Sequence, residues 1–136
     1  MKKILLSLLL LSSLLYSDSY TREDRIKDMQ EMAEAMNTIQ SGFFYNNYDT
    51  VAKGVEHLTS SVEGVRPPLE ELEEKDIMTR YMNNKVQMTR KVVRQINQKS
   101  LTILQRFKNG DSAQAVQAYK KILAQCMACH RETRNW

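Results

Sequence analysis

The chain has 136 residues, enough for one domain of ordinary size, and a formal net charge of +4. Its mildly basic balance includes no run of Lys and Arg interleaved with aromatic residues, so nothing points to nucleic acid. Both cysteines lie in one short motif, Cys126 to Cys129, which leaves no structural disulfide to explain.

Residues 1–17 have the pattern of a secretory signal peptide. Two lysines are followed by an apolar run over residues 4–15, and Ser17 or Ser19 offers a small residue for cleavage. The apolar run is about twelve residues long, whereas a membrane-spanning helix needs about twenty. We therefore expect an exported protein whose mature domain covers residues 18–136 and has no stable membrane insertion after cleavage.

The chain beyond the signal peptide is poor in residues that interrupt helices, with four Gly and two Pro in the whole sequence. No segment alternates apolar and polar residues for long enough to indicate a strand. The sequence therefore predicts an all-α domain of four helices. The expected ranges are about Arg22–Tyr45, Asp49–Gly64, Asp76–Lys108, and from Asp111 to beyond His130.

Capping residues support these boundaries. Thr21 with Asp24 is a capping-box signal for the first helix, and Asp49 is expected to cap the second. Gly110 suits the left-handed position that follows a helix end, and Asp111 then resembles the cap of the fourth helix.

The first helix carries an apolar stripe that we expect to face the core. Its members recur at helical spacing: Ile26, Met29, Ala33, Met36, Gln40 and Phe43. Met32 falls at the edge of the stripe. Arg25 projects onto it one turn before Met29, and a cation on an inward face needs an anionic partner or an exit to solvent.

The other helices also have apolar faces. The second has a narrow one, from which His57 points away, so His57 is expected to be solvated and not an iron ligand. The third has a wide face, as expected for a helix between two neighbours. The stripe on the fourth continues through Cys126 and His130 to Arg134, with Cys129 at its edge. The expected core residues on these helices are Val51, Val55, Leu58, Val62, Met78, Tyr81, Met88, Val92, Ile96, Ile103, Leu104, Phe107, Ala115, Val116, Tyr119, Ile122 and Leu123.

The segment Cys126-Met127-Ala128-Cys129-His130 reads C-x-x-C-H, the attachment pattern of c-type haem. The two thiols add across the vinyl groups of one haem, and His130 supplies an imidazole to the iron. At i, i+3 and i+4 of a helix these side chains share a face. The alternatives are a redox C-x-x-C or half of a zinc site. Beyond the motif the chain has one further His and no further Cys, and no strand precedes the motif.

The motif predicts one covalent haem c per chain, and its chemistry agrees with export. Haem of this type is attached outside the bacterial inner membrane, so we expect a periplasmic protein. Short connections favour an antiparallel up-down-up-down four-helix bundle. In that topology the first helix begins where the fourth ends, so Arg25 and Met29 should lie close to Cys126 and His130.

In helix order and motif placement the chain resembles the class II c-type cytochromes, the family of cytochrome c′ and its low-spin relatives. The resemblance rests on a C-x-x-C-H close to the C-terminus, preceded by Gly110-Asp111 and an Ala-rich helix. Arg134, four residues after His130, is similar to a basic residue that the family often has there. Arg25-x-x-x-Met29 resembles the family's Arg followed by the residue over the distal haem face.

The resemblance implies that Met29 is a second iron ligand opposite His130, as in the low-spin members, and it favours transfer of single electrons between redox partner proteins. The alternative is a five-coordinate cytochrome c′ that binds small gases such as NO or CO. Arg25 would pair with a haem propionate or reach solvent. Met32 and Met36 could also approach the ring, although core packing is the usual role of Met.

We expect no enzymatic activity. The predicted distal face has no general acid or base paired with Arg for O–O cleavage, so a peroxidase is the weaker hypothesis. The resemblance also allows a homodimer through the first two helices. Phe43, Phe44 and Tyr45 are the apolar residues to inspect at that interface.

Overall fold

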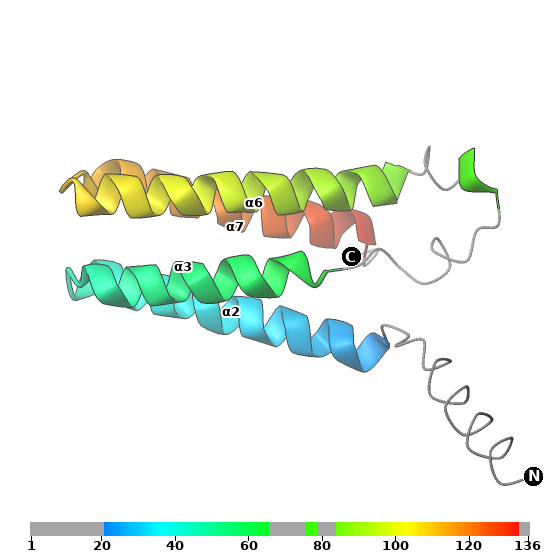
Figure 1. The fold of residues 1–136 in the computed structure, drawn as a ribbon, viewed down its shortest axis with the longest axis horizontal. Helices are drawn as coiled ribbons and strands as arrows, with labels where there is room; N and C mark the ends of the chain where they lie inside the picture. The colour runs from blue at the N-terminus through cyan, green and yellow to red at the C-terminus, as the bar shows by residue number, and fades with distance from the viewer. Residues whose placement is uncertain (1–20, 66–75, 79–83, 134–136) are drawn as a thin grey trace, which may run out of the picture.

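The computed structural model describes residues 21–65, 76–78 and 84–133, and four helices account for most of them. They are α2 (Arg22–Phe44), α3 (Tyr48–Glu63), α6 (Asn84–Lys108) and α7 (Ser112–Thr133) (Figure 1). No strand occurs among the described residues. The predicted all-helical domain of four helices is therefore confirmed for this part of the chain. The predicted signal peptide, Tyr81 and Arg134 lie outside the described residues.

Short turns fold the helices into two hairpins, α2 with α3 and α6 with α7 (Figure 1). The first turn contains Asn46 at φ 48°, a left-handed conformation that Asn tolerates better than most residues. The second contains Gly110 at φ 78°, which confirms the left-handed position expected there. Between the two hairpins, α3 packs against α6.

Capping hydrogen bonds fix where these helices begin. Thr21 and Asp24 form the predicted capping box, in which Asp24 N–H donates to Thr21 Oγ1 over 3.2 Å and Thr21 N–H donates to the Asp24 carboxylate over 2.7 Å. The predicted cap of α3 was wrong. Asn47 occupies that position, because its side-chain oxygen accepts the Thr50 N–H at 2.9 Å, and Asp49 lies in the first turn.

Two glycines bring α2 and α3 unusually close together. A Cβ on Gly54 would lie 2.8 Å from the backbone nitrogen of Ile39, and a Cβ on Gly42 would lie 2.7 Å from the backbone nitrogen of Val51. Such contacts with backbone atoms leave no room for a side chain. The first hairpin is therefore held by direct contact between helix backbones.

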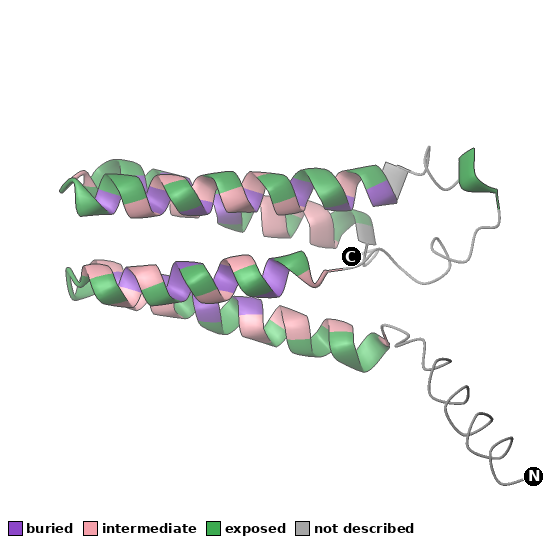
Figure 2. Ribbon diagram, in the orientation of Figure 1, coloured by how far each residue is buried: buried purple, intermediate pink, exposed green. Residues whose placement is uncertain are grey.

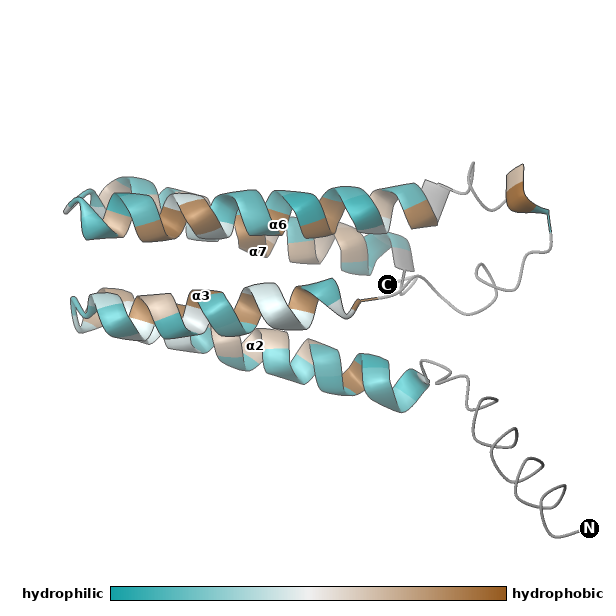
Figure 3. Cartoon of the chain, viewed as in Figure 1, coloured by the Kyte–Doolittle hydropathy of each residue, from teal (hydrophilic) through white to brown (hydrophobic). Residues whose placement is uncertain are grey.

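The core lies along the inner faces of all four helices, where buried and apolar residues gather (Figures 2 and 3). The predicted face of α3 is confirmed, since Val51, Val55, Leu58 and Val62 are all buried. Elsewhere the agreement is partial. Val92, Ile96, Ile103, Phe107, Ala115 and Ile122 are buried as expected, whereas Met78, Val116 and Leu123 are exposed.

The predicted inward stripe of α2 needs a correction. Met36 is buried as predicted, whereas Ile26, Ala33 and Gln40 are exposed. The other buried residues of α2 lie outside the predicted stripe or at its edge: Met32, Ala35, Ile39 and Gly42. The reason is that α2 has two different apolar faces. Small residues near Ala35 pack against α3, while the face that includes Met29 and Ala33 borders a cavity.

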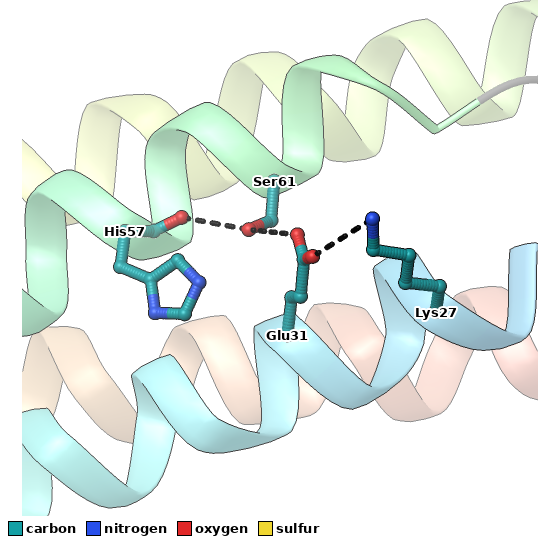
Figure 4. Close-up of polar contacts among 4 residues, drawn as sticks. All are labelled: Lys27, Glu31, His57 and Ser61. Atoms are coloured by element: carbon teal, nitrogen blue, oxygen red, sulfur yellow. Dashed lines mark hydrogen bonds and ion pairs between the residues drawn. The ribbon is translucent and has the colours of Figure 1, made fainter. Parts of the chain in front are cut away.

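A polar contact joins α2 to the C-terminal end of α3 (Figure 4). The buried Ser61 hydroxyl on α3 lies 2.9 Å from the His57 carbonyl oxygen, to which it donates, and 3.5 Å from the Glu31 carboxylate on α2. Lys27 lies 3.9 Å from the other carboxylate oxygen of Glu31.

None of the helices in the described part of the chain has the length and apolar character that a membrane crossing requires.

Candidate haem-binding site

A cavity of about 300 Å³ is lined by residues from all four helices of the bundle. Its walls come from α2 between Met29 and Asn37, the N-terminal half of α6, the C-terminal end of α3 with Val65 beyond it, and α7 between Tyr119 and His130. The volume is at the lower end of the range for ligand sites. The lining residues are Met29, Met32, Ala33, Met36, Asn37, Val62, Val65, Thr89, Val92, Val93, Ile96, Tyr119, Leu123, Cys126, Met127, Cys129 and His130.

The cavity lies where α2 and α7 diverge. At its closed end the ring of Phe43 packs 5.2 Å from that of Phe107 and 5.8 Å from that of Tyr119, measured between centroids. The Tyr119 hydroxyl also lies 3.5 Å from the Gln40 side-chain oxygen, which links α7 to α2. These contacts close one end of the space between α2 and α7. The thiols, His130 and Met29 line the cavity beyond that closure.

The two thiols of the motif border the cavity as partly buried side chains and are not joined in a disulfide. Burial raises the pKa of the Cys126 thiol, and the neighbouring Cys129 raises it further. Burial likewise raises the pKa of the Tyr119 hydroxyl, with a smaller effect from Cys126. Cys126 is therefore held as a neutral thiol in apolar surroundings.

The structure brings the predicted axial residues to the same cavity. His130 is partly buried near the end of α7, and Met29 is partly buried near the start of α2. Met32 and Met36 also line the cavity and are more deeply buried, each 8% exposed. Methionine therefore dominates the α2 wall.

Two other predicted positions lie away from the cavity lining. Arg25 is partly buried, one turn before Met29, and is not among the lining residues. His57, which the sequence predicted to be solvated, is partly buried on α3 and is not among the lining residues. Arg134 lies outside the described residues.

The sequence did not indicate several of the residues that line the cavity. Thr89 on α6 is buried against the cavity, and Asn37 on α2 borders it as an exposed residue. Thr89 lies on the same helix face as Val93 and Ile96, at helical spacing. A search for apolar residues at that spacing does not find Thr89, because Thr is polar. Met127, inside the C-x-x-C-H motif, also lines the cavity although it is 51% exposed.

Within the described residues, no group of three or more His, Cys, Asp and Glu side chains is placed to hold a metal ion. Comparison with known proteins finds no matching family model, no matching curated protein and no matching solved structure.

Proposed function

We propose that the chain is a periplasmic monohaem c-type cytochrome that carries single electrons between redox partner proteins. In this proposal the four helices form an antiparallel up-down-up-down bundle around one haem c. The observation that carries the proposal is that Cys126, Cys129, His130 and Met29, from the two ends of the sequence, line one apolar cavity. The class II cytochromes, which the chain resembles, place the same residue types in this way.

The residues of the cavity fit a haem. Two thiols and an imidazole occupy one wall, and the opposite wall on α2 is apolar apart from Asn37 and rich in thioether sulfur. Leu123 and Met127 border the same cavity with 48% and 51% of their surface exposed. A large flat apolar group held by α7 would cover such surface, and removing it from water is favourable.

When bound, a haem supplies an iron centre that accepts and releases one electron. Cys126 and Cys129 would tether it, and His130 would donate a ring nitrogen from the same helix face. The thioether of Met29 would be a second ligand of the iron. Such ligation would raise the reduction potential and would leave no open position for a substrate. Arg25 and Arg134 are the candidate partners for the propionates, because an Arg fork suits a carboxylate.

The alternative function is that of a five-coordinate cytochrome c′ that binds NO or CO. The favourable observation is that the α2 wall is apolar apart from Asn37 and contains three methionines. In this alternative Met29 acts as a lid, while Met32 and Met36 shape an open pocket. The two functions differ in whether the sulfur of Met29 binds iron.

Substitution of Met29 tests the proposal directly. If Met29 is the ligand, Met29→Ala converts a six-coordinate, low-spin haem into a five-coordinate, high-spin haem, and the reduced variant binds CO rapidly. Optical spectroscopy of the ferric and ferrous proteins measures both changes. Met88→Ala is the matched control, since Met88 packs against the core from α6 without lining the cavity. A wild-type-like spectrum of Met29→Ala would contradict the ligand assignment.

A further inference from the structure

The cavity contains more sulfur than a haem site with His and Met ligation uses. Of the eight methionines in the sequence, Met29, Met32, Met36 and Met127 line this one cavity. Both cysteines and His130 line it as well. Six sulfur atoms and one imidazole therefore border about 300 Å³ of space.

Thioether and thiolate sulfurs are soft ligands, and among the common metal ions they select Cu(I). Met32 and Met36 are each only 8% exposed and line the cavity from α2, and the cysteines line it from α7. Methionine has three rotatable bonds and adapts to irregular spaces. Its sulfurs can therefore converge on an ion much smaller than the cavity.

Charge also favours a monovalent ion. An apolar cavity disfavours any net charge, because burying an uncompensated ion is costly. One Cu(I) with one cysteine thiolate and neutral thioethers is neutral overall. A divalent ion such as Zn²⁺ would need two thiolates for the same balance, and its preferred ligands do not include thioethers.

We propose that the chain without attached haem binds one Cu(I) in this cavity, held by the α2 methionines Met32 and Met36 and by one cysteine of the C-x-x-C pair on α7. Binding releases the proton of that thiol to solvent and involves no change in oxidation state. The bound ion occupies a sulfur that haem attachment requires. Cu(I) binding and haem attachment at this motif are therefore mutually exclusive.

The site rests on the residues of this chain and does not depend on the proposed cytochrome function. A chain that never carries haem would still bind Cu(I), and a low-spin cytochrome without affinity for Cu(I) would refute this inference alone. The two proposals thus fail independently.

The test is an anaerobic titration of the full, haem-free chain with the Cu(I) complex of bicinchoninate, whose colour is lost as the protein takes the metal. We expect one Cu(I) per chain. Met32→Leu/Met36→Leu should weaken the affinity by about tenfold or more, since even outer-shell partners of a metal are worth that much. Met88→Leu, at a methionine away from the cavity, should bind as the wild type does.

A second measurement assigns the thiolate. One equivalent of Cu(I) should slow alkylation of the cysteines by iodoacetamide in the wild type, and do so less in the methionine double variant. Leu conserves the volume of Met, so the variants should keep their helices, which circular dichroism checks. If the double variant loses helicity, the two single variants, Met32→Leu and Met36→Leu, are compared with the wild type in its place.

Three results would overturn the proposal. The first is that the wild type fails to take Cu(I) from bicinchoninate, and the second is that the methionine variants bind Cu(I) as tightly as the wild type. The third is that both thiols react with iodoacetamide as fast with Cu(I) as without it. The second result would mean that the methionines of the cavity serve only in core packing.

Discussion

Burial governs the chemistry of Cys126 more than its sequence neighbours do. The thiol borders an apolar cavity, and desolvation raises its pKa, with Cys129 adding to the effect. Because the thiolate is the nucleophile, a raised pKa makes Cys126 less reactive in the folded haem-free chain than in an unfolded one. The sequence motif alone predicts the residue's role and says nothing of this protection.

This protection predicts a pH dependence. The folded-state pKa is raised, so the contribution of this thiol to stability is fully present below the ordinary thiol pKa and is lost as pH rises through the folded pKa. In a haem-free Cys129→Ser variant, iodoacetamide should modify Cys126 more slowly than in the same variant unfolded in urea. The rate should rise at a higher pH in the folded chain. Superimposable pH profiles would show that burial does not protect the thiol.

The sequence could indicate the C-x-x-C-H motif, because its residue types occur at a fixed spacing, and Met29, through the expected bundle topology and the resemblance to class II cytochromes. It could not indicate that Met32 lies deeper in the cavity wall than Met29, since that depends on how α2 is rotated against two neighbours. Asn47 was missed for a similar reason. Asn and Asp are both good caps, and only the path of the turn decides between Asn47 and Asp49.

At the scale of elements, the α2–α3 hairpin is the most tightly constrained unit. Its helices approach so closely that Gly54 faces the backbone of Ile39 and the carbonyl oxygen of Ala35. This contact holds the α2 wall of the cavity against α3, so the positions of Met29, Met32 and Met36 depend on it.

We therefore expect Gly54→Ala to destabilise the protein by about 1–3 kcal/mol, the usual cost of overpacking. The new Cβ would lie 2.8 Å from backbone and side-chain atoms of Ile39, and this clash outweighs the better helix propensity of Ala. Urea unfolding followed by circular dichroism measures the change.

Gly64→Ala is the matched control for that experiment. Gly64 has a helical φ of −70°, and a Cβ there would approach neighbouring atoms no closer than 3.4 Å. Its replacement should be neutral or should stabilise the protein by about 0.4–1 kcal/mol. Equal effects of the two substitutions would refute the close packing of α2 against α3.

Periodicity predicted the helices with unequal success, for a physical reason. The α3 face was right because Val51, Val55, Leu58 and Val62 form one narrow stripe that packs on one side. The predicted α2 face was partly wrong because α2 has two buried faces. Its small residues pack against α3, and its methionines line the cavity, so a single apolar stripe cannot describe both contacts.

At the scale of the molecule, two hairpins joined at α3 and α6 diverge between α2 and α7. Phe43 packs against Phe107 and Tyr119 and closes one end of that space, whereas Phe44 and Tyr45 next to it are exposed. Phe43 is thus part of the core, and only its two neighbours remain as candidates for the dimer contact that the sequence suggested. The cysteines, His130 and Met29 border the cavity that this divergence creates.

We propose that His130 and Met29 are the two iron ligands of a covalent haem held in this cavity. The most direct test is the absorption spectrum of the ferric protein, purified after export with haem attached. Ligation by both residues predicts a low-spin spectrum with the weak long-wavelength band of a methionine–iron bond. A high-spin spectrum, with rapid CO binding after reduction, would refute ligation by Met29 and favour the five-coordinate alternative.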